Sequence, residues 1–166
     1  MTMATKVRNQ IFVNLEKLQR SRKKPNVGDV FAIRPKGQPY LFGRVICTNA
    51  EVGGFPRGIL IYLYKTPSPS KTAIPELRLD ELLVAPLATN RLPWTHGYFE
   101  TVSSRPLSAS DRLRAHCFRD FTGTYFDEMG RPLSGPVEPV GEFGLQSFRT
   151  IDDLVSDALG IERAHE

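Results

Sequence analysis

Histidine is the first residue type to consider, because its imidazole serves both as a metal ligand and as a general base near neutral pH. The chain has 166 residues and three histidines, of which His96 and His116 lie away from the C-terminal end. Metal motifs usually place a second ligand a few residues from the first, and neither position has another histidine or cysteine two to four residues later. We expect a surface or hydrogen-bonded structural histidine at each position and no metal site.

The two cysteines, Cys47 and Cys117, are far apart in sequence and form no C-x-x-C motif. His116 precedes Cys117, which suggests a base beside a thiol. Adjacent residues of a strand point to opposite faces, however, so they cannot form that pair. Both cysteines are interpreted as reduced core residues.

The remaining polar motifs also have structural explanations. Asp152 and Asp153 follow Thr150 in the pattern that opens a helix, where acidic residues cap the first turn and complement the helix dipole. The segment 53–58 is rich in glycine but lacks the Lys-Ser/Thr ending of a phosphate-binding loop. A hydrolase needs a nucleophile, a base and an orienting group within reach. The sequence therefore predicts no enzyme and no cofactor.

Aromatic residues are the other candidates for function. Phe55 lies in a loop, Trp94 follows a proline, and Tyr98 and Tyr125 open expected strands. Such side chains anchor protein interfaces when they are exposed, but they serve equally well in a core. Both interpretations stay open at this stage.

These residues must be positioned by strands. Residues 27–33 and 40–47 predict two strands joined by a tight connection at 35–39, with Gly43 inside the second strand. Residues 58–64 predict a third strand. Its alternate positions are apolar on both sides, which indicates a strand that is covered on both faces.

The second half of the chain predicts shorter elements. Alternation over 98–102, 112–118 and 124–127 favours short strands, and 128–131 reads as a turn. Apolar positions from Ile151 to Leu159 recur at helical spacing and end at Gly160, which predicts a C-terminal helix.

The N-terminal segment is distinct in charge. Val7, Ile11, Leu15 and Leu18 are spaced by four, four and three residues, which predicts an amphipathic helix over about 7–21. Residues 1–24 contain seven basic and one acidic residue, whereas the formal net charge of the whole chain is +4, so the remainder is slightly acidic. We expect a basic helical arm at 1–26 and a single β-rich domain at 27–166.

Size and hydropathy are those of an ordinary soluble protein. A chain of this length buries roughly 70% of its unfolded surface, so folding requires neither metal nor disulfide. The longest apolar runs have the length of strands and fall far short of the roughly 20 residues that span a bilayer. The N-terminus carries charges where a signal peptide has an apolar block. We expect a cytoplasmic location and no membrane association.

The opening pattern is similar to that of the immunity protein 26 family of bacterial polymorphic-toxin systems. The resemblance rests on Gly28–Ile33, on Phe42–Val45, and on the loop and apolar strand that follow. Later segments also fit the family pattern. The resemblance would cover residues 27 to about 160. These later segments are Pro86-Leu87, Pro93-Trp94, Gly97–Phe99 and Pro139–Leu145.

The resemblance implies a small β-rich protein. With the helices that the residue spacing predicts, we expect a mainly β (α+β) fold, a small SH3-like curled sheet or barrel with an N-terminal and a C-terminal helix. The resemblance also implies a protein that binds a cognate toxin made in the same cell and neutralises it by stoichiometric contact, without cofactor or catalytic residue. We expect toxin contacts at Phe55, Arg57, Trp94 and Tyr98, chosen by residue type and loop placement.

The alternative hypothesis is a nucleic-acid-binding SH3-like barrel. The basic residues 20–24 would follow phosphates, while Phe31, Tyr40 or Phe42 would stack on bases. A solvated helix end and a packed hairpin explain the same residues, so nucleic acid is the less favoured partner.

Overall fold

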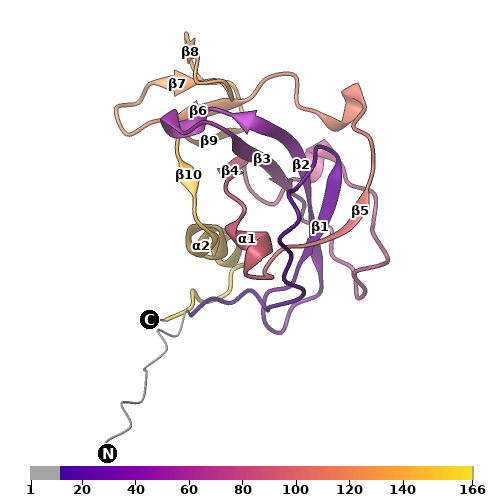
Figure 1. The fold of residues 1–166 in the computed structure, drawn as a ribbon. Helices are drawn as coiled ribbons and strands as arrows, with labels where there is room; N and C mark the ends of the chain where they lie inside the picture. The colour runs from indigo at the N-terminus through magenta and orange to yellow at the C-terminus, as the bar shows by residue number, and fades with distance from the viewer. Residues whose placement is uncertain (1–11, 166) are drawn as a thin grey trace, which may run out of the picture.

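The computed structural model describes residues 12–165, which form two β-sheets with two helices beside them (Figure 1). The first sheet has the strand order β10-β4-β3-β2-β1-β5 and the second β8-β7-β6-β9. The first comprises β1 (Asp29–Ile33), β2 (Leu41–Ala50), β3 (Gly58–Leu63), β4 (Leu87–Thr89), β5 (Glu100–Ser104) and β10 (Leu145–Gln146). The second comprises β6 (Cys117–Arg119), β7 (Tyr125–Phe126), β8 (Pro132–Leu133) and β9 (Val140–Glu142).

The fold is mainly β, as the sequence predicts, but it differs in closure. After β5 the chain leaves the first sheet, and β6 to β9 form a second sheet in place of strands that would close the first. Among residues 12–165 both sheets are open and no closed barrel forms. Of the expected curled sheet or barrel, the barrel is therefore wrong for these residues, which form two open sheets.

The β1–β2 hairpin is confirmed, and its glycine has a clear role. Phe31 and Gly43 face each other in the antiparallel register. A Cβ placed on Gly43 would lie 2.2 Å from Cζ of Phe31, because the Phe31 ring lies across this point of β2. A larger residue at position 43 would have to displace a fully buried ring.

Apolar residues cover both faces of β3, as its composition predicts. Ile59, Ile61 and Leu63 belong to one buried cluster, together with residues of β1, α1 (Leu92–Thr95) and α2 (Phe148–Leu159). Leu60 and Tyr62 belong to a second cluster on the other face, which also contains Phe118 of β6. The first sheet is thus the central layer, with the helices on one face and the second sheet on the other (Figure 1).

One short segment supplies an edge strand to each sheet. β9 pairs in parallel with β6, and β10, which begins three residues later, pairs in parallel with β4. Gly141 of β9 lies so close to the backbone oxygen of Pro86 that a Cβ would come within 2.5 Å of it. The segment 140–146 therefore connects the two layers.

The expected N-terminal helix is wrong over the described residues. Its first part, residues 7–11, lies outside the described residues, whereas residues 12–21 are extended and not helical. The backbone N–H of Leu15 donates to Oδ1 of Asp152 over 2.8 Å, and that of Leu18 donates to the carbonyl of Gly97 over 2.8 Å. Because distant groups bind these N–H groups, the segment packs as an extended strap, with Leu15 buried in the core.

The C-terminal helix is confirmed, but its start and the role of Asp152 differ from the prediction. The side chain of Ser147 caps the N-terminus by accepting from the N–H of Thr150, and Gly160 ends the helix at a φ of 67°. Asp152 lies in the second turn and is 2% exposed. Its carboxylate binds the N–H groups of Asn14 and Leu15 instead of capping the helix.

Candidate functional site

The loop between β2 and β3 is the most prominent exposed apolar feature that the sequence singled out. Phe55 is 55% exposed, and Arg57 is exposed with a φ of 58°, in the left-handed region that favours glycine. The 3-10 turn η1 (Val52–Gly54) precedes them, and Gly53 and Gly54 have φ values of 75° and 78°. The two glycines allow the turn that directs Phe55 and Arg57 into solvent.

This loop is anchored at its base. The N–H of Glu51 donates to the carbonyl of Glu128 over 2.8 Å, and Val52 is buried at 1% exposure. A Cβ on Gly53 would lie 2.8 Å from Cα of Gly144, so the loop backbone packs directly against the turn between β9 and β10. The anchoring holds the exposed pair on a defined backbone, which lowers the entropy lost on binding.

Two hollows flank the loop. One of about 650 Å³ lies between the loop and the β7–β8 turn, and one of about 370 Å³ lies between β3 and the start of α1. The first is lined by Glu51, Gly53, Gly54, Pro56, Phe126, Met129, Gly130 and Phe143. The second is lined by Arg57, Ile59, Asn90, Arg91 and Leu92. Exposed anchors beside surface hollows are features of protein-binding surfaces.

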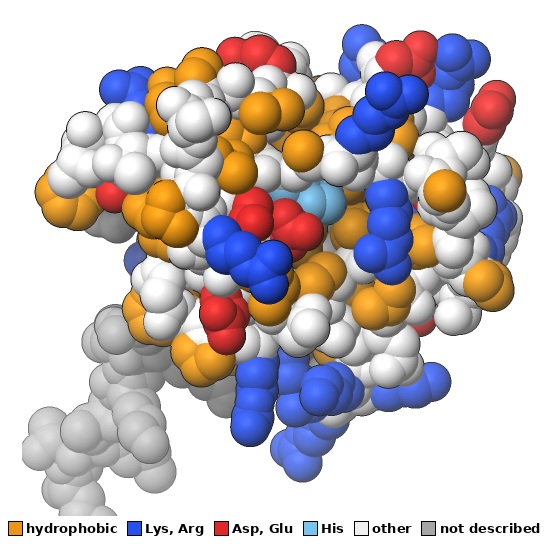
Figure 2. Space-filling view, turned by 90° about the horizontal axis from the view of Figure 1, so that it is seen from above, with side chains coloured by type: hydrophobic (Ala, Val, Ile, Leu, Met, Phe, Trp, Pro, Cys, Tyr) orange, Lys and Arg blue, Asp and Glu red, His pale blue; other side chains and the backbone are white. Residues whose placement is uncertain are grey.

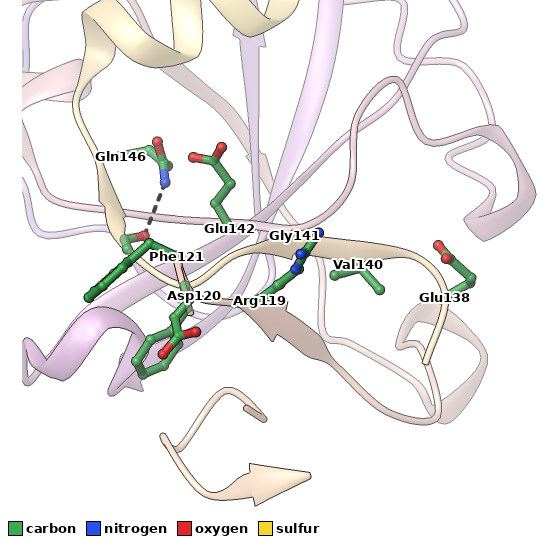
Figure 3. Close-up of a pocket in the computed structure, with 10 residues that line it drawn as sticks. Arg119, Asp120, Phe121, Glu138, Val140, Gly141, Glu142 and Gln146 are labelled. Carbon is green, nitrogen blue, oxygen red and sulfur yellow. Dashed lines mark hydrogen bonds between the residues drawn. The ribbon is translucent and has the colours of Figure 1, made fainter. Parts of the chain in front are cut away.

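A third hollow of about 760 Å³ lies at the β6–β9 edge of the second sheet. Arg119, Asp120 and Phe121 come from the end of β6 and the turn after it, opposite residues of β9 and the chain before it (Figure 3). Phe121 is fully exposed, at 101%. The lining of this third hollow contains positive, negative and apolar side chains. One of its residues, Phe143, also lines the hollow between the 51–57 loop and the β7–β8 turn.

Trp94 and Tyr98, the other two expected contact residues, lie in the core at 2% exposure each. The Trp94 ring packs against Phe31 with centroids 5.2 Å apart, and Tyr98 packs against Phe148 at 5.1 Å. The structure therefore brings Phe55 and Arg57 together at the surface and separates Trp94 and Tyr98 from it. The expectation of toxin contacts at Trp94 and Tyr98 is therefore corrected, because side chains buried in the core do not reach a partner directly.

The base-stacking residues of the nucleic-acid hypothesis are also internal. Phe31 and Phe42 are 0% exposed. Tyr40 is half-buried, with the guanidinium of Arg34 4.7 Å from its ring centroid. The strand aromatics thus offer no open stacking platform, which leaves the exposed basic residues as the support for that alternative.

A buried hydrogen-bonded chain links the two sheets, and sequence analysis did not find it. Oη of Tyr62 on β3 lies 2.6 Å from Nε2 of His116, whose Nδ1 lies 3.4 Å from Oε2 of Glu128. Tyr62 also accepts the N–H of Leu113 over 3.0 Å. Burial raises the pKa of Tyr62 and lowers the pKa of His116, so both groups favour their neutral forms.

The hydrogen-bonded series Tyr62, His116 and Glu128 is suited to a structural role. Tyr62 is 0% and His116 7% exposed, so neither offers its reactive atoms to a substrate in solution. A tyrosine with a raised pKa is also a weak nucleophile at neutral pH. His116 is thus a buried, hydrogen-bonded histidine, as the sequence predicts. Its partners are 54 and 12 residues away, and no local motif could have indicated them.

Within 12–165, no group of three or more His, Cys, Asp or Glu side chains is arranged to hold a metal ion. No helix in this part of the chain has the length and apolar character needed to cross a bilayer.

Comparison with known proteins gives one result for this chain. No curated protein and no solved structure matches it. A family model for immunity protein 26 matches residues 26–124, which include strands β1 to β6 and the 51–57 loop. This match spans more than half of the chain, and its start coincides with the hairpin on which the sequence resemblance rests. The chain therefore belongs to the immunity protein 26 family.

Proposed function

We propose that this protein binds one cognate bacterial toxin in the cytoplasm of the cell that makes it, and blocks the toxin by stoichiometric contact. Membership of the immunity protein 26 family, whose model covers residues 26–124, carries the proposal. The mechanism needs no turnover and no cofactor. Its strength depends on a preformed face that complements the toxin.

The 51–57 loop is the proposed centre of that face. Phe55 and Arg57 are of the residue types that dominate binding energy in protein interfaces, and both project from an anchored backbone. The hollows beside the loop would receive side chains of the toxin. Trp94 and Tyr98 are buried in the core and are no longer proposed as contacts.

The test uses the toxin domain encoded beside the gene for this protein. Purified protein and an inactivated toxin domain are titrated by calorimetry, and cells that express the active toxin are scored for survival. We expect a 1:1 complex, with Phe55→Ala weakening it about 10-fold to 100-fold, as for a buried aromatic anchor.

Phe12→Ala is the matched control, because Phe12 is exposed to a similar extent, 51%, and lies on the N-terminal strap. It should leave binding within about twofold, since most interface and surface residues contribute little. If the wild-type protein neither binds the toxin domain nor protects the cells, the proposed function is wrong. If Phe55→Ala and Phe12→Ala bind equally well, the loop is not the contact site.

A further inference from the structure

The N-terminal strap places a basic stretch beside α1. The N–H of Ser21 donates to the carbonyl of Trp94 over 3.1 Å, and Nη2 of Arg91 donates to the carbonyl of Arg22 over 2.6 Å. A Cβ on Gly97 would lie 3.1 Å from the backbone nitrogen of Arg20. The strap backbone is therefore fixed at several points along 18–22, and its basic side chains project from this fixed backbone.

Six basic side chains on the strap, on the 51–57 loop and at the start of α1 are exposed, and we call them the basic face. They are Arg20, Arg22, Lys23, Lys24, Arg57 and Arg91. Arg57 and Arg91 line the same hollow of about 370 Å³, and Arg91 contacts the strap. Lys and Arg side chains also gather along the lower edge of the molecule in Figure 2.

These charges are uncompensated within the described part of the chain. Within residues 12–165, no Asp or Glu side chain forms an ion pair with any member of the basic face. The nearby Glu16 is paired instead with Arg34, at 3.9 Å. Exposed like charges grouped in this way repel one another and attract an anionic partner.

The hollow at the basic face also has apolar lining. Ile59 and Leu92 line it together with Asn90 and the two arginines, and Leu92 is 45% exposed. A phosphate backbone would use the arginines but would gain nothing from the exposed leucine. An apolar side chain flanked by carboxylates would match the apolar lining and the arginines together.

We propose that the basic face receives an acidic segment of the toxin, with one apolar side chain of that segment entering the hollow between Arg57 and Arg91. This inference rests on the proposed function and specifies the chemistry of the partner. Arg57 then belongs both to the 51–57 loop and to the basic face, so the two surfaces form one contact region.

The test is a charge reversal measured against a matched control. The double variant Arg57→Glu/Arg91→Glu and the double variant Lys65→Glu/Arg78→Glu change the net charge equally. Lys65 and Arg78 are exposed and lie beyond the opposite end of β3 from the hollow. Binding of the inactivated toxin domain is titrated for each protein at 50 and 300 mM NaCl.

We expect the reversal at the hollow to weaken toxin binding at least about 100-fold at 50 mM NaCl and to reduce the dependence of Kd on salt, because like charges then face each other. The control should change Kd by less than about threefold. Equal effects of the two double variants would overturn the inference while leaving the proposed function intact. A wild-type protein that does not bind the toxin domain contradicts both.

A second experiment tests whether the anionic partner of the basic face is a nucleic acid and not the toxin. A 20-nucleotide single-stranded RNA and a 20-base-pair DNA duplex are titrated with the same proteins. We expect no binding above that of the control variant at 300 mM NaCl. If the wild-type protein binds either nucleic acid and only the reversal at the hollow abolishes it, while toxin binding is unchanged, the basic face is a nucleic-acid surface and the proposal is wrong.

Discussion

Asp152 holds the N-terminal strap, and removing its carboxylate should destabilise the protein strongly. Its two oxygens accept the N–H groups of Asn14 and Leu15 over 2.9 and 2.8 Å. Hydrogen bonds to a charged acceptor stabilise a protein by about 1.5–3 kcal/mol each. The net loss is smaller than the sum of two such bonds, because the released N–H groups bind water and because burial of the carboxylate already costs free energy. For Asp152→Ala we expect the free energy of unfolding to fall by about 2–4 kcal/mol.

Two further variants sharpen this prediction. Asp152→Asn keeps one acceptor oxygen but places its amide NH₂ opposite the second backbone N–H, where two donors face each other. We expect its free energy of unfolding to fall by about 1–2 kcal/mol. Asp153→Ala is the control: its side chain is 41% exposed and its ion pair with Arg163 spans 3.8 Å, so its loss should be within about 0.5 kcal/mol.

The measurements are urea unfolding at pH 7 and hydrogen exchange of individual amides. The amides of Asn14 and Leu15 should exchange faster in Asp152→Ala, while those of β3 should change only as global stability falls. Equal stability of the Asp152→Ala and Asp153→Ala variants, with unchanged exchange at Asn14 and Leu15, would refute the reasoning.

The same carboxylate predicts a dependence on pH. Burial raises the pKa of Asp152 above its ordinary value of 3.8, so the folded state binds this proton more tightly than the unfolded chain. The stabilisation from this proton is full below pH 3.8 and is lost as the pH rises through the folded pKa. Relative to Asp152→Asn, the wild-type protein should therefore gain stability as the pH is lowered from 7 towards 4.

Three other predictions concern the core. Gly43→Ala should cost about 1–3 kcal/mol in urea unfolding because its Cβ meets the Phe31 ring, whereas Gly135→Ala, with nothing within 4 Å, should be nearly neutral. Similar stability of the two variants would contradict this. Tyr62→Phe should cost about 1–3 kcal/mol, since the buried His116 and the part-buried N–H of Leu113 both lose their partner. Burial lowers the pKa of His116 below 6.5, so its contribution to stability is full above pH 6.5 and falls as the pH drops. A His116→Gln variant should lose less stability than the wild-type protein between pH 7.5 and 5.5, and parallel pH profiles would argue against this assignment.

Local patterns were sufficient to predict the first three strands and the C-terminal helix, whereas the short strands β4, β8, β9 and β10 were not predicted and only the end of the expected strand 112–118 is a strand. The β1–β2 hairpin follows from two apolar runs around a connection that contains Pro and Gly. The burial of β3 on both faces follows from the apolar residues at its alternate positions. Phe55 was also identified as a candidate anchor because a loop between two strands lies at the surface.

Long-range partners account for what the sequence did not predict. Leu15 and Leu18 have helical spacing, yet the described part of their segment is extended because Asp152 and Gly97 bind its N–H groups from far along the chain. Tertiary hydrogen bonds here override a weak local preference. Asp152 itself reads as a helix cap until its buried partners are known.

The contact surface was predictable in part for a similar reason. An aromatic residue type does not distinguish a core position from an exposed one, so Trp94 and Tyr98 could not be separated from Phe55 by sequence. The basic stretch 20–24 was evident, but its position beside Arg91 depends on the path of the strap along α1.

The segment 140–146 has a consequence for how the protein can be made and handled. Because it supplies β9 to one sheet and β10 to the other, a fragment that stops near residue 124 would leave β4 and β6 with unpaired backbone groups. Strands with unpaired backbone groups pair with strands of other molecules, which leads to aggregation. During synthesis both layers must likewise wait for nearly the last residues to leave the ribosome, which predicts slow, late folding dominated by contacts distant in sequence.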